Sequence, residues 1–159
     1  MRGIKVVPLP KKDVSSVHSL LYNIIEEMYS GNYRAIKNYK NQYTIKRMNE
    51  LAVRKDGYCF IAKMDNKVIG FGLGYIFGGV GFLHWLGIDK KYRLIGIGSL
   101  IVNSIHQYFR RNKCHKSGVY TDSKNERLVN FYKKKGYRIR ARLHDHWFHL
   151  NVVYLVKKL

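Results

Sequence analysis

The stretch Tyr92-Arg93-Leu94-Ile95-Gly96-Ile97-Gly98-Ser99 decides the fold, because it joins an apolar, strand-like run at residues 82–88 to an amphipathic helix. Its two glycines allow the backbone to approach a ligand without an intervening Cβ. The helix that follows offers unpaired N–H groups and the positive end of its dipole. The segment therefore predicts an anion site, with phosphate as the expected anion.

Two common phosphate-binding patterns do not fit this loop. In the dinucleotide-binding pattern Gly-x-Gly-x-x-Gly, a third glycine would stand where the chain has Ile101. No Gly-Lys-Ser/Thr follows either, as it would in a P-loop. The loop by itself leaves an alternative open, namely a strand-to-helix turn whose glycines serve only backbone geometry.

The composition predicts one globular domain, residues 1–159, with a strongly basic surface. A chain of 159 residues with 46% apolar residues can bury a core of ordinary size. Its 30 Lys and Arg exceed its 10 Asp and Glu, and the formal charge of +20 favours nucleic acid, an anionic membrane or a polyphosphate cofactor as a partner. The same charge disfavours polycationic substrates. A basic surface without a specific partner is the alternative.

The cysteines and histidines predict neither a disulfide nor a metal site. Cys59 and Cys114 lie far apart, which is typical of a reducing compartment. The basic N-terminal segment lacks the apolar run of an export signal, so we expect a cytoplasmic protein. Residues 144–149 include three histidines, but neighbouring residues alternate faces at an expected hairpin. A place in the wall of an acceptor pocket is favoured over metal binding there.

Residues 68–88 contain no Asp, Glu, Lys or Arg and have the length of a membrane span. Their Gly70-x-x-x-Gly74-x-x-x-Gly78 spacing is also typical of packed transmembrane helices. However, seven glycines weaken any such helix, and Gly78-Gly79 falls between two β-prone runs. We therefore expect two buried strands and no membrane association.

The remaining pattern predicts alternating strands and helices without repeats or linkers. Residues 32–43, rich in tyrosine and lysine, are expected either as a helix-to-helix loop that receives a substrate or as a solvated basic face. The helix that begins at Gly98 places His106 on its polar face. The other expected elements are strand 4–7, helix 13–30, helix 44–54 ended by Asp56-Gly57, strands 58–63, 67–77 and 81–88 with a tight turn at Asp65-Asn66, strand 117–121, helix 125–135, and strands 137–143 and 147–156.

This order of elements resembles that of the GNAT acetyltransferase superfamily, and two motifs carry the resemblance. Arg93-x-x-Gly96-x-Gly98 is similar to the family's (Arg/Gln)-x-x-Gly-x-(Gly/Ala) loop. Asn125-x-x-Leu128-x-x-Phe131-Tyr132-x-x-x-Gly136-Tyr137 resembles the family's Asn-x-x-Ala-x-x-Leu-Tyr-x-x-x-Gly-Phe. The resemblance implies an α/β (α+β) fold with a mixed, mostly antiparallel sheet. A central parallel pair of strands would splay around the cofactor, and about four helices would flank the sheet.

The resemblance also implies acetyl-coenzyme A as cosubstrate. The backbone amides of Ile95, Gly96, Ile97, Gly98 and Ser99 would hold its pyrophosphate, with Arg93 as a nearby charge. Leu94 and Ile95 are apolar where the family often has glycine and a basic residue. Lys134, or its neighbour Lys133, would meet the 3′-phosphate. The cofactor-binding residues implied in this way are Leu86, Gly87, Ile88, Arg93, Leu94, Ile95, Gly96, Ile97, Gly98, Ser99, Asn125, Phe131, Tyr132 and Lys134.

The same resemblance assigns Tyr132 as the acid that protonates the departing thiolate, since a phenol can donate a proton at neutral pH. A buried core tyrosine is the alternative. No carboxylate lies between Lys67 and Asp89, so His84 is the only titratable candidate for the base on the last central strand. A water chain as the base, or a purely structural His84, remains open. A backbone N–H of Leu86 or Gly87 would polarise the thioester carbonyl.

These residues predict an N-acetyltransferase that acts on a primary amine, on either a small molecule or a protein. A protein N-terminus or a lysine is the expected acceptor, because the basic surface disfavours polyamines and offers no carboxylate-lined pocket for an aminoglycoside. The rival interpretation is a non-catalytic module that binds nucleic acid or the ribosome through its basic surface. Either a monomer or a homodimer is compatible with the sequence.

Overall fold

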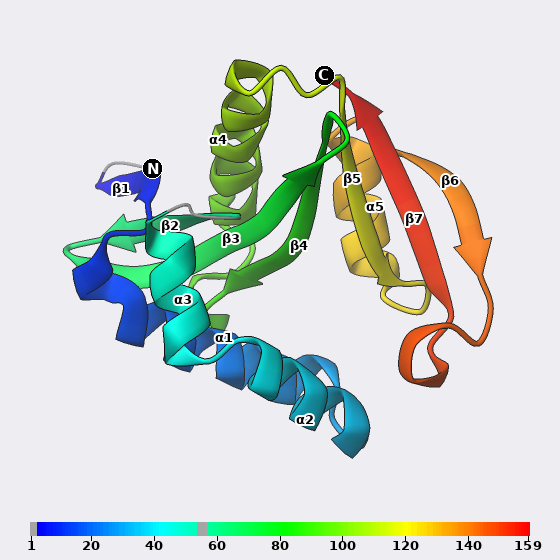
Figure 1. Ribbon diagram of the computed structural model, residues 1–159, viewed down its shortest axis with the longest axis horizontal. Helices are drawn as coiled ribbons and strands as arrows, with labels where there is room; N and C mark the ends of the chain where they lie inside the picture. Colours follow the sequence, from blue (N-terminus) through cyan, green and yellow to red (C-terminus); the bar gives the residue numbers. More distant parts are fainter. Residues whose placement is uncertain (1–2, 54–56) are drawn as a thin grey trace. The chain divides into compact units, whose positions relative to one another are not determined.

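The chain folds into the alternating strands and helices that its hydrophobic pattern predicts (Figure 1). The computed structural model describes residues 3–53 and 57–159. The strands are β1 (Ile4–Pro8), β2 (Tyr58–Met64), β3 (Lys67–Phe77), β4 (Val80–Ile88), β5 (Lys116–Asp122), β6 (Arg138–Leu143) and β7 (Val152–Lys158). The α-helices are α1 (Val14–Met28), α2 (Tyr33–Gln42), α3 (Ile45–Ala52), α4 (Ile97–Arg111) and α5 (Glu126–Lys134), and short 3-10 turns are η1 (Lys11–Asp13), η2 (Lys90–Tyr92) and η3 (Trp147–His149).

The strands form one mixed sheet with the hydrogen-bonded order β1-β2-β3-β4-β5-β7-β6. The pairs β1–β2, β2–β3, β5–β7 and β6–β7 are antiparallel, whereas β4 and β5 are parallel, with Val80–Phe82 opposite Lys116–Gly118. A parallel pair needs a crossover connection, which α4 supplies between β4 and β5. The expected mixed, mostly antiparallel α/β fold is confirmed. The splaying of the parallel pair around a cofactor stays a prediction.

The described residues cluster into two compact units. Unit 1 comprises Met1–Gly74 and Trp85–Ile105, and unit 2 comprises Tyr75–His84 and His106–Leu159. The boundaries fall within β3, β4 and α4. The single domain expected over residues 1–159 stays a prediction.

Helices cover both faces of the strands in unit 1 (Figure 1). An ideal Cβ placed on Gly87 would come within 2.4 Å of Ile24 in α1, and one on Gly70 within 3.2 Å of Ile101 in α4. Phe71 also lies against Gly87, and adjacent residues of a strand face opposite sides, so α1 and α4 pack on opposite faces. Glycine at these positions lets the helices approach the sheet closely.

Unit 2 is built on the ladder between β5 and β7, which pairs Lys116–Asp122 with Val152–Lys158 along their full length. β6 adds to the edge of β7, with a register shift between Ile139 and Ala141. Helix α5 lies behind β5 and β7 in Figure 1 and buries Val129 and Tyr132. Helix α5 therefore covers one face of β5 and β7 and does not cover the other.

Two local predictions fail in the N-terminal half. Residues 32–43 are helical, because the side chain of Asn32 caps the backbone N–H of Ala35, and Ala35 and Tyr39 are buried one turn apart. Of the two alternatives, the loop is therefore wrong, whereas exposed Arg34 and Lys37 agree with a solvated basic face. Five α-helices are present among the described residues, where about four were expected. The expected helix end at Arg54 and the stop at Asp56 lie outside the described residues.

The last predicted strand begins too early. Trp147–His149 forms a 3-10 turn in which Phe148 has a φ of 56°, and β7 begins only at Val152. Other turns form as expected. Asp65 and Asn66 both have positive φ, as do Gly78 and Gly79 between β3 and β4. Residues 68–88 accordingly belong to two strands, and no helix of the described residues is long and apolar enough to cross a membrane.

Candidate functional site

The loop between β4 and α4 lies entirely in unit 1 and has the backbone geometry of an anion cradle. Leu94 and Gly96 adopt positive φ values of 70° and 87°. The Arg93 N–H donates to the carbonyl oxygen of Lys90, and the next N–H groups along the chain that donate to the backbone are those of Ser99 and Leu100, both to the carbonyl oxygen of Gly96. Within the described residues, the N–H groups of residues 94–98 donate to no other backbone group. Successive N–H groups of this kind, at the start of a 15-residue helix, form a concavity that attracts anions.

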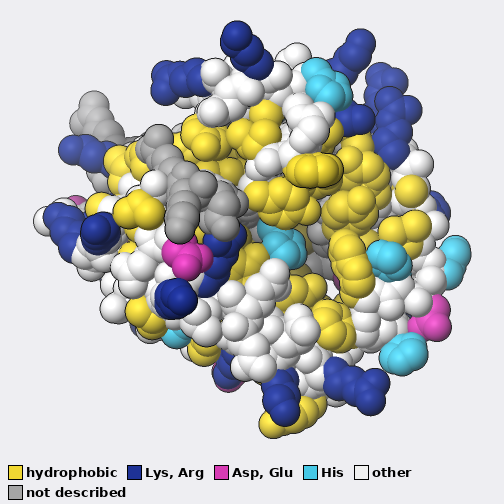
Figure 2. All heavy atoms as spheres, in the orientation of Figure 1, with side chains coloured by type: hydrophobic (Ala, Val, Ile, Leu, Met, Phe, Trp, Pro, Cys, Tyr) yellow, Lys and Arg dark blue, Asp and Glu magenta, His cyan; other side chains and the backbone are white. Residues whose placement is uncertain are grey.

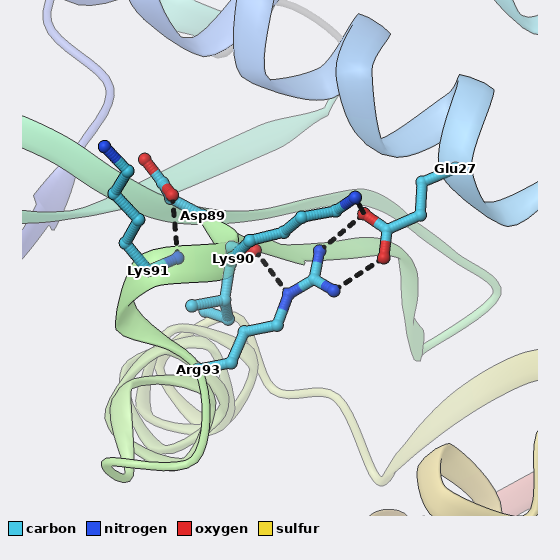
Figure 3. A network of polar contacts seen from close by, with 6 residues as sticks. Glu27, Asp89, Lys90, Lys91 and Arg93 are labelled. Carbon is cyan, nitrogen blue, oxygen red and sulfur yellow. Dashed lines mark hydrogen bonds and ion pairs between the residues drawn. The ribbon is translucent and has the colours of Figure 1, made fainter.

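The Arg93 side chain, at the start of this loop, forms hydrogen bonds with other residues of unit 1 (Figure 3). Its guanidinium donates to both carboxylate oxygens of Glu27 in α1, at 2.6 and 2.8 Å, and its Nε donates to the carbonyl oxygen of Ile88 at 3.0 Å. The Lys90 ammonium lies 3.7 Å from the same carboxylate, and Asp89 accepts from the N–H of Lys91. The Arg93 hydrogen bonds lower the pKa of Glu27, and Glu27 in turn raises the pKa of Arg93.

This contact differs from the role that the sequence suggests for Arg93, a charge near the pyrophosphate. The guanidinium instead ties the end of β4 to α1, so the cradle is held in place by an ion pair between residues 66 positions apart. Sequence reasoning missed Glu27. Its only signal is that Glu26-Glu27 is a rare acidic pair in a basic chain.

The β4 residues of unit 1 that the resemblance assigns to the cofactor precede the loop directly. Leu86 and Ile88 are half-buried, and Gly87 is buried. Gly87 has no room for a side chain, because a Cβ there would meet both Ile24 and the ring of Phe71 within 2.5 Å. Packing against these two side chains is therefore enough to explain why this position requires glycine.

His84 belongs to unit 2, where it is half-buried on β4. Its ring lies edge-on to Tyr75, with 6.4 Å between the ring centres. Burial lowers the pKa of His84 to about 4, so the imidazole is neutral at physiological pH. A neutral imidazole can accept a proton, but one with this pKa is a weak base.

Tyr132 and its neighbours lie on α5 in unit 2. The Tyr132 ring is 1% exposed between Phe131 and Tyr137, and burial raises its pKa far above the ordinary value. Its hydroxyl forms no hydrogen bond with the described residues. Asn125 caps α5, since its side chain accepts from the N–H of Leu128 at 3.1 Å. Lys134 is exposed in the last turn.

Two polar features inside unit 2 escaped sequence reasoning. Thr121 on β5 is buried, and its hydroxyl oxygen has no hydrogen-bond partner among the described residues. The Tyr137 hydroxyl bonds both His106 Nε2 and Ser117 Oγ at 2.7 Å. His106 is therefore buried, and its expected place on the polar face of the helix is wrong. The ring is tolerated inside because Tyr137 satisfies it, and burial together with nearby cations lowers the pKa of His106 to about 4.

An aromatic surface covers the face of unit 2 that α5 leaves open. Tyr120 and Tyr154 stack with 4.4 Å between ring centres, Trp147 meets Tyr120 edge-on, and Tyr75 stacks on Phe82. Figure 2 shows hydrophobic side chains gathered over β5 and β7 on this face. Such a surface suits an apolar or aromatic group more than a highly charged one.

The histidines of residues 144–149 lie on the exposed turn between β6 and β7. His149 Nδ1 lies 2.8 Å from Asp145, and both side chains are largely exposed. Within the described residues, no group of three His, Cys, Asp or Glu is placed to hold a metal ion.

Comparison with known sequences places these features in a family. A model of the acetyltransferase (GNAT) family matches residues 20–137. An uncharacterized N-acetyltransferase of Methanocaldococcus jannaschii is 31% identical over 87 residues, which cover 54% of this chain and 56% of that protein. The match thus spans about half the length of that relative.

Solved structures resemble the chain over nearly its whole length. The PaiA N-acetyltransferase of Thermoplasma acidophilum, solved in complex with coenzyme A, superposes with a TM-score of 0.83 at 19% identity and covers 98% of this chain and 99% of its own. A ribosomal-protein-alanine N-acetyltransferase of Brucella melitensis gives a TM-score of 0.76 at 14% identity, with coverage of 98% and 99%. At these identities the structures establish a shared fold.

Proposed function

The chain belongs to the GNAT acetyltransferase family, and from this premise we propose that it transfers the acetyl group of acetyl-coenzyme A to the α-amino group of a protein or peptide. The observation that carries the proposal is the row of unpaired N–H groups at residues 94–98, which fits a pyrophosphate. The buried, unpartnered hydroxyl of Thr121 on β5 is a second feature that a polar ligand would satisfy. The residues present therefore fit acetyl-coenzyme A.

The proposed roles in binding follow the family motifs. The amides of residues 94–99 hold the pyrophosphate, and Leu86, Gly87, Ile88, Asn125 and Phe131 contact the pantetheine arm. Lys134 serves the 3′-phosphate. Arg93 acts through its ion pair with Glu27, which positions the loop.

The proposed chemistry uses two side chains of unit 2. An acceptor that binds as an ammonium loses a proton to His84 or to water, and the neutral nitrogen attacks the carbonyl carbon of the thioester, whose C–S bond then breaks. Tyr132 donates its hydroxyl proton to the leaving thiolate and regains one from the nitrogen, which must lose its second proton to become an amide. An unpaired Tyr132 hydroxyl and a raised pKa suit a group that donates a proton and does not stay ionised.

The pKa of His84 bears on which amine is the acceptor. A base with a pKa of about 4 is poorly matched to a lysine ammonium, whose ordinary pKa is about 10.4. An α-amino group has an ordinary pKa of about 8, so a sizeable share is already neutral near pH 7.5. An α-amine therefore needs little help from the enzyme, which favours a protein N-terminus over a lysine. A cytoplasmic location fits this substrate and stays a prediction.

Ligand-dependent stability and acetyl transfer test this function together. Acetyl-coenzyme A at about 100 times its dissociation constant stabilises the folded state by about 2.7 kcal/mol, a rise in melting temperature of roughly 5–10 °C, while ATP as a charge control gives a smaller rise. Transfer should occur to a peptide with a free N-terminus and not to an Nα-blocked peptide that contains lysine.

Variants separate the catalytic roles from binding. Tyr132→Phe should lower kcat by about 100-fold or more and keep the thermal shift, because only the donated proton is lost. His84→Gln should have a smaller effect, since the base it removes is weak. Full activity of Tyr132→Phe would remove the proposed acid, and equal shifts with ATP and acetyl-coenzyme A would remove the proposed cofactor site.

A further inference from the structure

One end of unit 2 carries a group of cations and, among its described residues, no Asp or Glu side chain. β5 begins there, β7 ends there, and both α4 and α5 reach their C-terminal ends there, so their cationic residues meet. The Asp and Glu side chains of unit 2 lie elsewhere. Asp122 is at the far end of β5, Glu126 begins α5, and Asp145 is in the turn between β6 and β7. We call the following residues the cationic end: Arg110, Lys113, Lys116, Lys135, Lys157 and Lys158.

Specific contacts bring these cations together. Lys116 and Lys158 stand directly opposite each other in the β5–β7 ladder. The Lys157 ammonium donates to the carbonyl oxygen of Lys135 at 2.7 Å. The charges of Lys157, Arg110 and Lys135 together help to lower the pKa of the buried His106 ring. Dark-blue Lys and Arg side chains gather at the upper right of Figure 2, over this end of unit 2.

None of the six cations forms an ion pair with a carboxylate in the described part of the chain. Unit 1 behaves differently, since Asp13, Glu26, Glu27 and Glu50 each pair with a cation there. Like charges that stand directly opposite in a ladder destabilise it. An external polyanion would remove this repulsion, so the cationic end has the chemistry of a polyanion site.

An exposed aromatic ring lies on the hairpin that borders the cationic end. Phe77 is 76% exposed at the end of β3, and the Gly78-Gly79 turn follows it. The carbonyl oxygen of Gly79 accepts from the N–H of His115 at 3.0 Å, and Val80 pairs with Lys116. The unburied ring therefore stands at the tip of the hairpin whose second strand, β4, runs beside Lys116.

We propose that the cationic end of unit 2 binds single-stranded nucleic acid, with its cations on the phosphates and Phe77 stacked on a base. A ring beside a cationic track is the combination by which proteins hold single strands without sequence preference, because every base has a face for stacking. An acidic peptide carries no nucleobase that could stack on the Phe77 ring. A membrane would need a broader apolar face than one ring among exposed lysines.

Binding of a fluorescein-labelled 20-nucleotide oligouridine to the full chain, followed by anisotropy between 50 and 200 mM NaCl, tests this proposal. Each phosphate contact in a single strand contributes about −0.7 to the slope of log affinity against log salt. Neutralising Lys113, Lys116 and Lys158 to Gln should reduce the slope by about 2 and weaken binding at least tenfold. The matched control neutralises Lys124, Arg127 and Arg142 to Gln. It removes the same charge outside the cationic end and should change affinity less than threefold.

Phe77→Ala provides the second arm and leaves the charge unchanged. Stacking of about 1–3 kcal/mol per base corresponds to a loss of about 5- to 150-fold, without a change in the salt slope. Equal loss in the two triple variants would mean that charge alone acts, and would overturn the proposal. No loss in Phe77→Ala would overturn it too. Polyglutamate or phosphatidylserine vesicles bound as tightly as the oligouridine in the same salt would reassign the surface to an acidic protein or a membrane.

Discussion

At the scale of single residues, the histidines show how burial sets chemistry. Burial lowers the pKa of both His106 and His84 to about 4, although the two rings have different surroundings. His106 is enclosed and bonded to Tyr137, whereas His84 lies half-buried against Tyr75. The first links α4 to Tyr137 inside unit 2, and the role of the second as the base stays a proposal.

The buried His106 predicts a loss of stability in mild acid. Its pKa is about 4 when folded and about 6.5 when unfolded, so the unfolded chain binds more protons between these values. The contribution is complete above pH 6.5 and falls as the pH drops towards 4. Its full size is on the order of 3 kcal/mol, at 1.36 kcal/mol per pKa unit. Urea unfolding at pH 7.5 and pH 5 measures it.

His106→Gln should flatten this pH dependence, because glutamine does not titrate and still offers the Tyr137 hydroxyl a partner. His149→Gln is the matched control, since that side chain is exposed on the β6–β7 turn. An unchanged difference between pH 7.5 and pH 5 in His106→Gln would show that other groups cause the acid loss.

At the scale of elements, the ion pair between α1 and the loop couples stability to cofactor binding. Glu27 and Arg93 make two hydrogen bonds, but both side chains are about one-third exposed, so the pair is worth only about 1 kcal/mol. We expect Glu27→Gln and Arg93→Gln each to destabilise by that amount or less. Each should also raise the KM for acetyl-coenzyme A about fivefold, because the loop loses its anchor.

A double-mutant cycle with KM as the readout checks this coupling. The effects of the two variants should not add, because each removes the same contact. Glu26→Gln is the control on the same helix, since Glu26 pairs with Lys40 and not with the loop. An equal rise in KM for Glu26→Gln, or additive effects of the two test variants, would contradict a positioning role.

At the scale of the whole molecule, repulsion among cations limits stability. The chain carries a formal charge of +20, and the ion pairs among the described residues use few of its 30 Lys and Arg. Salt shortens the screening length from about 30 Å at 0.01 M to about 10 Å at 0.1 M. We therefore expect the melting temperature to rise between 10 and 200 mM NaCl.

The triple variant with Gln at Lys113, Lys116 and Lys158 should show a weaker rise than the wild type. It relieves repulsion that is already present at low salt. A melting temperature that falls with salt would mean that attractive pairs outweigh the repulsion.

The sequence by itself determined the alternating elements, the mixed sheet and the family. Alternation in β-prone runs, positive-φ turns at Asp65-Asn66 and Gly78-Gly79, and the glycines of the loop are all local signals, since each depends on a few adjacent residues. The two motifs at Arg93 and Asn125 added the family, which the match to residues 20–137 confirms. At residues 32–43 only the loop alternative failed, because the Asn32 cap and the burial of Ala35 and Tyr39 both favour a helix.

Only the tertiary structure decided which polar groups are paired. Arg93 turns to Glu27, 66 residues away, and His106 is buried because Tyr137, 31 residues away, satisfies it. The cationic end arises because β5 begins and β7, α4 and α5 end at one place, which no stretch of sequence displays. Hydrogen bonds and charges act through space over a few ångströms, so their partners follow from the fold and not from spacing along the chain.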